Sequence, residues 1–110
     1  MSQANRVWVV DDDKSIRWVL EKALSRAGIE VDLFANGELL LAELEQASPD
    51  VIISDIRMPG ISGLDLLGEI SARHPSLPVI ITTAHSDLDS AVSSYQSGAF
   101  EYLPKPFDIY

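Results

Sequence analysis

Acidic side chains at the ends of two apolar runs are the residues of this sequence best suited to chemistry. Asp11, Asp12 and Asp13 follow the run Val7–Val10 directly, and Asp55 follows a second run of the same kind. Carboxylates gathered in one pocket repel one another and resist ionisation unless a cation is present. Carboxylate oxygens are also the ligands that hard divalent ions prefer. The pattern therefore predicts a metal site, with Mg²⁺ as the first candidate.

A hydroxyl and an ammonium group follow two further runs. Val79–Thr83 ends in the hydroxyl of Thr83, and Lys105 follows Glu101–Pro104. Prolines on both sides of Lys105 restrict its backbone, so we expect its side chain to be aimed rather than mobile. Carboxylates, a metal ion, a hydroxyl and a lysine are together the groups that handle a phosphoryl group.

The composition is that of one globular domain. With 110 residues, the chain can bury roughly two-thirds of its unfolded surface in a single core. No apolar stretch approaches the roughly 20 residues of a membrane span, and no signal peptide is visible. The net charge of −9 argues against direct contact with nucleic acid, and the absence of cysteine fits a reducing compartment. We therefore expect a cytoplasmic domain that contacts neither nucleic acid nor membrane.

Short apolar runs alternate with stretches that are apolar on one side, which is typical of a parallel sheet flanked by helices. Strands are expected at 7–10, 30–34, 51–54, 79–82 and 101–103, with 30–34 at an edge. Helices are expected at 16–27, 39–44, 64–70 and 88–95. Gly28 is expected to end the first helix, and Asn36-Gly37 to form a turn before Leu39, Leu40 and Leu44 on the apolar side of the second.

This alternation predicts an α/β fold with a doubly wound, open, parallel five-stranded sheet in the flavodoxin-like order 2-1-3-4-5. Ligands of such sheets bind beyond the carboxyl ends of the strands. Asp11 to Asp13, Asp55, Thr83 and Lys105 all stand at those ends. Their convergence on one edge is a stronger signal than any one of them alone.

Each acidic residue also has an ordinary structural explanation. Asp13 is as well suited to cap the first helix as to join the metal site, and both readings stay open. Asp11 and Asp12 lie nearer the strand end, which favours a role in the site. Asp55 has no helix to cap within the next few residues, because Pro59 intervenes. Asp55 is therefore the residue expected to react.

Four fragments together resemble the receiver domain of bacterial two-component response regulators. They are VVDDD at 9–13, SDIRMPG at 54–60, TAH at 83–85 and YLPKPF at 102–107. Further fragments are similar to the nitrogen-regulation members of that family: SIRWVLE at 15–21, AHSDLD at 84–89 and GAFEYLPKPFD at 98–108. The resemblance covers almost the whole chain in the right order.

The resemblance implies that Asp55 accepts a phosphoryl group from a phosphohistidine of a sensor histidine kinase. Asp12 would bind Mg²⁺ directly and Asp11 through water, with the backbone carbonyl of Arg57 completing the protein ligands. The domain would not be an enzyme beyond self-catalysed transfer to Asp55 and slow autodephosphorylation. Its phosphorylation would control a transcription-activating output of the nitrogen-regulation type.

The resemblance also assigns roles to residues of the fourth and fifth strand regions. Thr83 and Lys105 would hold the phosphoryl oxygens, and Tyr102 would fill the space that Thr83 leaves on switching. Arg57 and His85 would influence how fast water removes the phosphoryl group. His74, by contrast, is expected to be only a residue at a helix end.

Receivers usually carry a fifth helix, and this sequence stops at Tyr110. We therefore expect residues 1–110 to form a receiver domain truncated before that helix, with ATPase and DNA-binding output domains in a longer protein. Homodimers are expected through helix four (88–95) and strand five, or through the face that the fifth helix would cover.

Two other classes fit parts of the pattern. An aspartate-nucleophile phosphatase would use Asp11 as nucleophile with Asp13, but would leave Asp55 without a role and needs a later acidic pair. A flavin-binding module fits the fold, but clustered carboxylates would repel its phosphate and no phosphate loop follows the first strand. The phosphatase is the alternative function.

Overall fold

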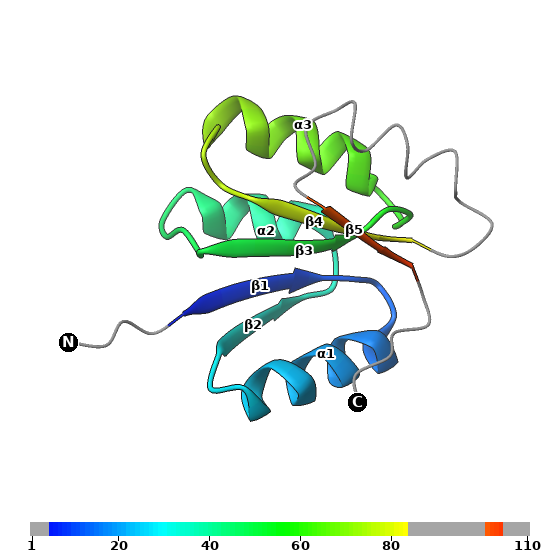
Figure 1. Ribbon diagram of the computed structural model, residues 1–110. Coiled ribbons are helices and arrows are strands. Elements are labelled where there is room, and N and C mark those ends of the chain that lie inside the picture. The colour runs from blue at the N-terminus through cyan, green and yellow to red at the C-terminus, as the bar shows by residue number, and fades with distance from the viewer. Residues whose placement is uncertain (1–4, 84–100, 105–110) are drawn as a thin grey trace.

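The chain forms an open parallel sheet with helices on both faces (Figure 1). This computed structural model describes residues 5–83 and 101–104, with side chains for 5–82. Its elements are β1 (Arg6–Val10), α1 (Lys14–Arg26), β2 (Glu30–Phe34), α2 (Gly37–Leu44), β3 (Val51–Asp55), α3 (Gly63–Arg73), β4 (Val79–Thr83) and β5 (Glu101–Pro104). The helix expected at 88–95 lies outside the described residues.

The five strands are all parallel and lie in the order β2-β1-β3-β4-β5, as the alternating pattern predicted. Val9 of β1 stands between Leu33 of β2 and Ile53 of β3. The prediction that 30–34 is an edge strand is confirmed. Each predicted strand is present, four of them lengthened by one residue at an end.

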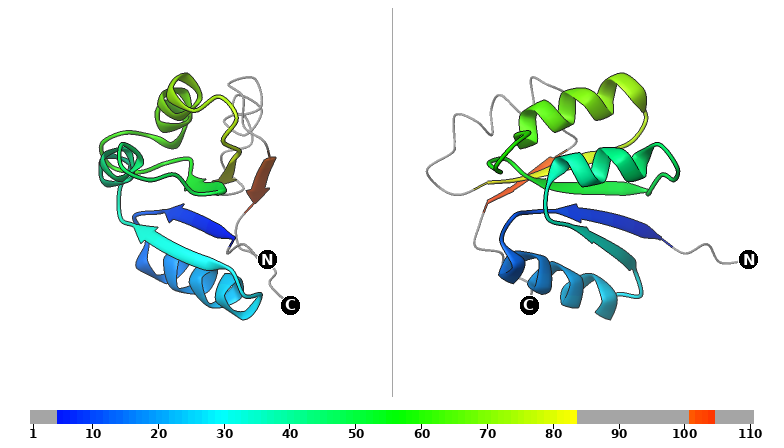
Figure 2. Two further views of the ribbon diagram at one scale, coloured as in Figure 1. Left: turned by 90° about the vertical axis from the view of Figure 1, so that its left-hand side faces the viewer. Right: turned by 180° about the vertical axis from the view of Figure 1, so that it is seen from behind.

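One face of the sheet carries the deeper core, beneath α2 and α3 (Figure 2). Trp8 of β1 is 1% exposed, and Ile52 of β3 and Ile81 of β4 are fully enclosed. The helices add five buried side chains to this core: Leu40, Leu44, Leu66, Leu67 and Ile70. Each such side chain contributes roughly 1.5–3 kcal/mol to the free energy of unfolding, which makes this face the main source of stability.

Among the described elements, α1 alone covers the other face (Figure 1). Leu20 of α1 is buried against Val9 and Ile53, and Ile16 and Leu24 are partly buried beside it. Their spacing of four residues puts them on one side of the helix. Gly28 has φ of 80° just after the C-cap, so the predicted end of this helix is confirmed.

All three described helices begin at a polar cap. Asp13, Asn36 and Ser62 accept hydrogen bonds from the backbone N–H groups of residues at the start of α1, α2 and α3. The prediction that Asn36-Gly37 is a turn was therefore incomplete, because Asn36 is an N-cap and Gly37 is already helical. Leu39 is 54% exposed and does not join the apolar side of α2 as expected.

Ion pairs join the first two strands at the sheet edge opposite the carboxyl ends. Arg6 reaches Asp32 at 2.9 Å and Glu30 at 3.1 Å, and these carboxylates raise the pKa of its guanidinium, the hydrogen bond to Asp32 most. Asp32 also accepts the indole N–H of the buried Trp8 at 3.1 Å.

No helix within residues 5–83 combines the length and the apolar character needed to cross a bilayer.

Candidate metal centre

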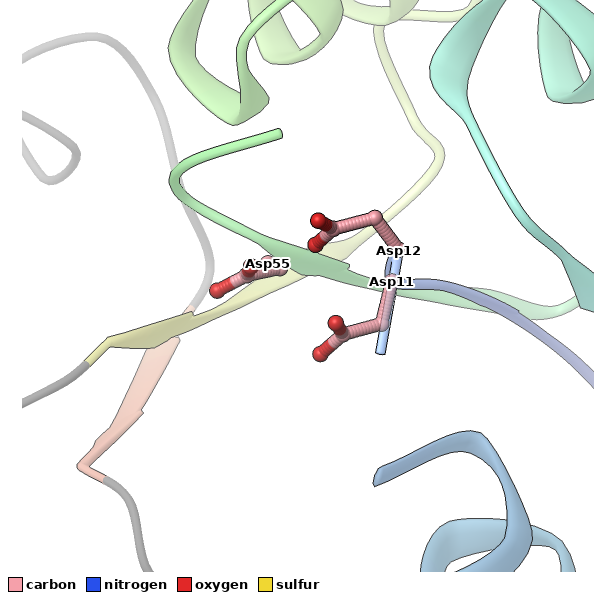
Figure 3. Close-up of side chains that lie close together, drawn as sticks. All are labelled: Asp11, Asp12 and Asp55. Carbon is pink, nitrogen blue, oxygen red and sulfur yellow. The ribbon is translucent and has the colours of Figure 1, made fainter. Parts of the chain in front are cut away.

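Three carboxylates meet at the carboxyl ends of β1 and β3. Asp11 and Asp12 directly follow β1, and Asp55 is the last residue of β3. The two strands are paired neighbours, with Val10 beside Ser54. One carboxylate oxygen from each of the three side chains lies within 4.8 Å of the others. Figure 3 shows how the three side chains are arranged. The structure therefore brings these three predicted site residues together.

The donor set of this cluster fits a hard divalent cation. Asp11 is 1% exposed and Asp55 8% exposed, whereas Asp12 is open to solvent. Buried carboxylates are tolerated when they are paired, hydrogen-bonded or bound to a metal. All three side chains offer oxygen and none offers nitrogen or sulfur, which favours Mg²⁺ or Ca²⁺ over softer metals. One exposed member leaves the cluster accessible from solvent.

Asp13 is not part of this cluster. Its backbone N–H donates to Oδ1 of Asp11 at 2.9 Å, and its own Oδ1 accepts the N–H of Ser15 at 2.8 Å. Its side chain is thus committed to capping α1. Of the two readings left open for Asp13, the structure shows the cap. The reason is local, because an aspartate just before a helix satisfies N–H groups that have no partner within the helix.

Arg17 is a contributor that sequence reasoning missed. Its Nη1 donates to the backbone carbonyl oxygen of Asp11 at 2.6 Å. The guanidinium therefore holds the backbone of a cluster residue from the second turn of α1. The available signal was its place four residues after the cap Asp13, where a helical side chain can reach back over the turn before it.

The loop from Ile56 to Ser62 closes back on the end of β3. The N–H of Ile56 donates to the carbonyl of Thr82 at 3.0 Å, and the N–H of Gly63 donates to the carbonyl of Ile56 at 2.9 Å. Ile56 is 3% exposed and Met58 9% exposed, so apolar side chains anchor the loop in the core. Arg57, expected to offer its carbonyl, stands on this loop with an exposed side chain.

The other predicted site residues are described in part or not at all. Thr83 is the last residue of β4, beside Pro104 of β5, but its side chain is outside the description. Tyr102 lies in β5 beside Ile81, again as backbone only. Lys105 and His85 lie outside the described residues. His74 is the C-cap of α3, as expected of a residue at a helix end.

The strand order and the acids at the carboxyl ends of its central strands define an α/β domain with a cluster of carboxylates, able to hold a cation, at the switch point of the sheet. A comparison with protein families makes the class specific. The chain belongs to the response regulator receiver domain family, whose model matches residues 7–110.

Curated relatives place the chain near one group within the family. It is 66% identical over 107 residues to the DNA-binding transcriptional regulator NtrC of Salmonella typhimurium. It is 42% identical to the C4-dicarboxylate transport transcriptional regulatory protein DctD of Rhizobium meliloti. The match to the Salmonella protein covers 97% of this chain and 23% of the relative, so the chain spans about a quarter of the curated relatives' length.

Solved structures agree on the fold. The apo receiver domain of nitrogen regulatory protein C is 66% identical, with a TM-score of 0.87 over 98% of this chain and 87% of that one. A receiver domain from Clostridium thermocellum is 37% identical, with a TM-score of 0.90 over 96% and 85% of the two chains. Membership of this family sets aside the phosphatase and flavin alternatives, and Asp13, which the phosphatase needed, caps a helix.

Proposed function

We propose that this domain accepts a phosphoryl group on Asp55 from a sensor histidine kinase, in the presence of Mg²⁺. The observation that carries the proposal is the cluster of Asp11, Asp12 and Asp55 at the carboxyl edge of the sheet. Membership of the receiver family supports the phospho-acceptor role. The cluster supports the metal.

Asp55 is the group proposed to react. Its carboxylate oxygen attacks the phosphorus of the phosphohistidine in line with the departing imidazole nitrogen, and an acyl phosphate forms as the phosphorus–nitrogen bond breaks. Asp55 is 8% exposed at the end of β3, so its carboxylate lies largely buried beside Asp11 and Asp12 while its backbone stays in the sheet. The domain thus takes part in the transfer, yet it turns over no substrate of its own.

Asp11, Asp12 and Asp55, with the backbone carbonyl of Arg57, are the groups proposed to hold Mg²⁺. When bound, the ion neutralises charge on the phosphoryl oxygens during transfer. The burial of Asp11 and its hydrogen bond from Asp13 orient one carboxylate before any cation arrives. The exposure of Asp12 leaves an entry for the ion and its water.

Thr83 and Lys105 are proposed to contact the phosphoryl oxygens through their hydroxyl and ammonium groups. A phosphoryl group adds negative charge and acceptor oxygens, which would draw the Thr83 hydroxyl inward. The ring of Tyr102 would then occupy the space that Thr83 leaves. The expected helix four (88–95) and strand β5 are the proposed output surface. Arg57 and His85 are proposed to tune the rate at which water removes the phosphoryl group.

The proposed output is transcription control of the nitrogen-regulation type in the cytoplasm. The names of NtrC relatives, which describe DNA-binding transcriptional regulators, support this proposal. The ATPase and DNA-binding functions would belong to other domains of a longer protein. The receiver itself, with its net charge of −9, is proposed to make no direct contact with nucleic acid.

Exposure to acetyl phosphate and Mg²⁺, followed by intact and peptide mass spectrometry, tests the proposal. We expect one added phosphoryl group, located on Asp55, and none after Asp55→Asn. Asp65→Asn is the matched control, since Asp65 is an exposed aspartate in the first turn of α3 that is not a member of the cluster. An acyl phosphate on Asp11, or undiminished labelling of the Asp55→Asn variant, would overturn the assignment.

Self-association is a further part of the proposal. The second sheet face has partly buried apolar residues beside α1, including Val51 and Ile80. A homodimer through this face would cover that apolar surface, and helix four (88–95) with strand β5 is the alternative dimer contact. Sedimentation velocity across a concentration series should show a concentration-dependent rise in mass, and a monomer at every concentration would contradict it.

A further inference from the structure

Glu38, in the first turn of α2, contacts the loop that follows Asp55. Its Oε2 accepts the backbone N–H of Ile61 at 3.0 Å across 23 positions of sequence. A carboxylate is a stronger acceptor for a backbone N–H than a neutral oxygen is. None of the roles proposed above uses Glu38, although it is the charged side chain that links α2 to this loop.

Two glycines make the close approach of α2 and the loop feasible. Gly60 has φ of 79°, and a Cβ atom there would lie 2.7 Å from Oε2 of Glu38. A Cβ atom at Gly37 would collide with the side chain of Ile61. A side chain at Gly60 would displace the Glu38 carboxylate, and one at Gly37 would displace the side chain of Ile61. The contact is thus built into the sequence on both of its sides.

The other end of the same loop contacts Asp55 itself. A Cβ atom at Gly63 would collide with the carbonyl oxygen of Asp55, so the start of α3 rests directly on the end of β3. The N–H of Gly63 also donates to Ile56, the residue after Asp55, at 2.9 Å. Ile61 precedes Gly63 by two residues. The segment that Glu38 contacts is therefore in direct contact, through Gly63, with the backbone that carries Asp55.

We propose that Glu38 is a positioning residue for the acid cluster. By holding the N–H of Ile61, it sets the place of loop 56–62, and hence the place of the Asp55 carboxylate relative to the carboxylates that follow β1. A cation needs all of its ligands in place at once, so releasing the loop weakens its binding. Partners that orient metal ligands typically contribute 10–100-fold to metal affinity. Glu38 makes a single hydrogen bond to the loop, so we expect its contribution at the lower limit of that range.

The inference rests on the metal part of the proposed function, and Mg²⁺ titrations followed by backbone amide chemical shifts test it. We expect Glu38→Ala to raise the Kd for Mg²⁺ about tenfold relative to wild type. Glu38→Gln should stay close to wild type, because its amide oxygen can accept the same bond. Glu43→Ala is the control, since it removes the same charge from an exposed position of the same helix.

A readout without metal separates positioning from general loss of stability. Well below the melting temperature of each variant, the Ile61 amide should exchange with solvent faster in Glu38→Ala than in Glu43→Ala. Wild-type Mg²⁺ affinity in Glu38→Ala would overturn the inference. So would equal weakening in Glu38→Gln, which would assign the effect to charge rather than to the hydrogen bond.

Failure of the proposed function has a different signature. Wild-type protein that binds Mg²⁺ but takes no phosphoryl group on Asp55 would overturn the phospho-acceptor role and leave the Glu38 comparison decisive. Wild-type protein that binds no Mg²⁺ would overturn both the metal site and the positioning role.

Discussion

Two connections bring the acid cluster together, and they are held in different ways. The turn after β1 is held mainly by its own side chains, since Asp11 accepts from Asp13 and Asp13 from Ser15, with one bond to a neighbouring strand, from the N–H of Asp11 to the carbonyl of Phe34 at 3.2 Å. The loop after β3 is held by other elements, with Glu38 of α2 bonded to Ile61. The first connection is thus held mostly by contacts within a few residues, whereas the second depends more on helices and strands packed elsewhere.

This difference separates the roles of the two connections. A turn held within a few residues forms whenever its helix forms, so losing one bond costs only a helix cap. A loop held by distant elements is correct only when α2, β3 and α3 are all in place. Changes at the loop after β3 should therefore affect both the free energy of unfolding and the cation site, whereas changes at Asp13 should affect stability alone.

The largest expected effect is that of Gly63→Ala. Its Cβ atom would collide with the Asp55 carbonyl, and backbone atoms cannot move aside as a side chain end can. We expect a loss of about 3 kcal/mol in the free energy of unfolding, measured by urea denaturation.

Gly68→Ala is the control for that change, on the same helix α3. Nothing lies within 4 Å of a Cβ atom there, and alanine favours helix over glycine. The control should gain about 0.5–1 kcal/mol. Equal effects at the two positions would show that α3 does not rest on β3 as described.

Gly60→Ala should follow, with a loss of about 2 kcal/mol. The positive φ of 79° is unfavourable for alanine, and the methyl group would displace the Glu38 carboxylate. Gly60→Ala and Glu38→Ala both disrupt the same hydrogen bond, from Ile61 to Glu38. The double variant should therefore lose less free energy of unfolding than the sum of the two single losses. Additive losses in a denaturation cycle would contradict the proposed contact.

Mg²⁺ should stabilise the wild-type domain by about 1.4 kcal/mol at ten times its Kd. Asp12→Ala should lose this gain, because one of the three carboxylates of the cluster is gone. Asp65→Ala, which removes an exposed acid elsewhere, should keep it. Melting curves with and without Mg²⁺ measure both, and an unchanged gain in Asp12→Ala would place the ion elsewhere.

The smallest effect is expected from Asp13→Ala. Losing the cap of α1 should cost about 1 kcal/mol, while the Kd for Mg²⁺ should stay within about twofold of wild type. Denaturation and amide-shift titrations measure the two quantities. If the Kd for Mg²⁺ rose as much as in Asp12→Ala, Asp13 would be a member of the cation-binding cluster. The turn after β1 would then not differ from the loop after β3 in the way described.

The sequence by itself determined the elements and the edge at which the site forms. Alternating apolar runs and helical spacing are properties of a few consecutive residues, so the strands, helix α1 and its end at Gly28 were predictable. Parallel strands have their carboxyl ends at one edge, which is why Asp11, Asp12 and Asp55 could be expected together. The family fragments then identified the class of domain.

Only the tertiary structure decided which polar groups take part and what holds them. From the sequence alone, Asp13 was equally suited to cap α1 and to bind a cation, because both roles need a carboxylate at the same place in the chain. Leu39 was expected on the apolar side of α2 but faces solvent, since its neighbours depend on how α2 packs on the sheet. Glu38 acts on the backbone N–H of Ile61, a residue that only the fold brings near it. A hydrogen bond to a backbone group leaves little trace in the identity of the residue that receives it, so such contacts are visible only when the chain is folded.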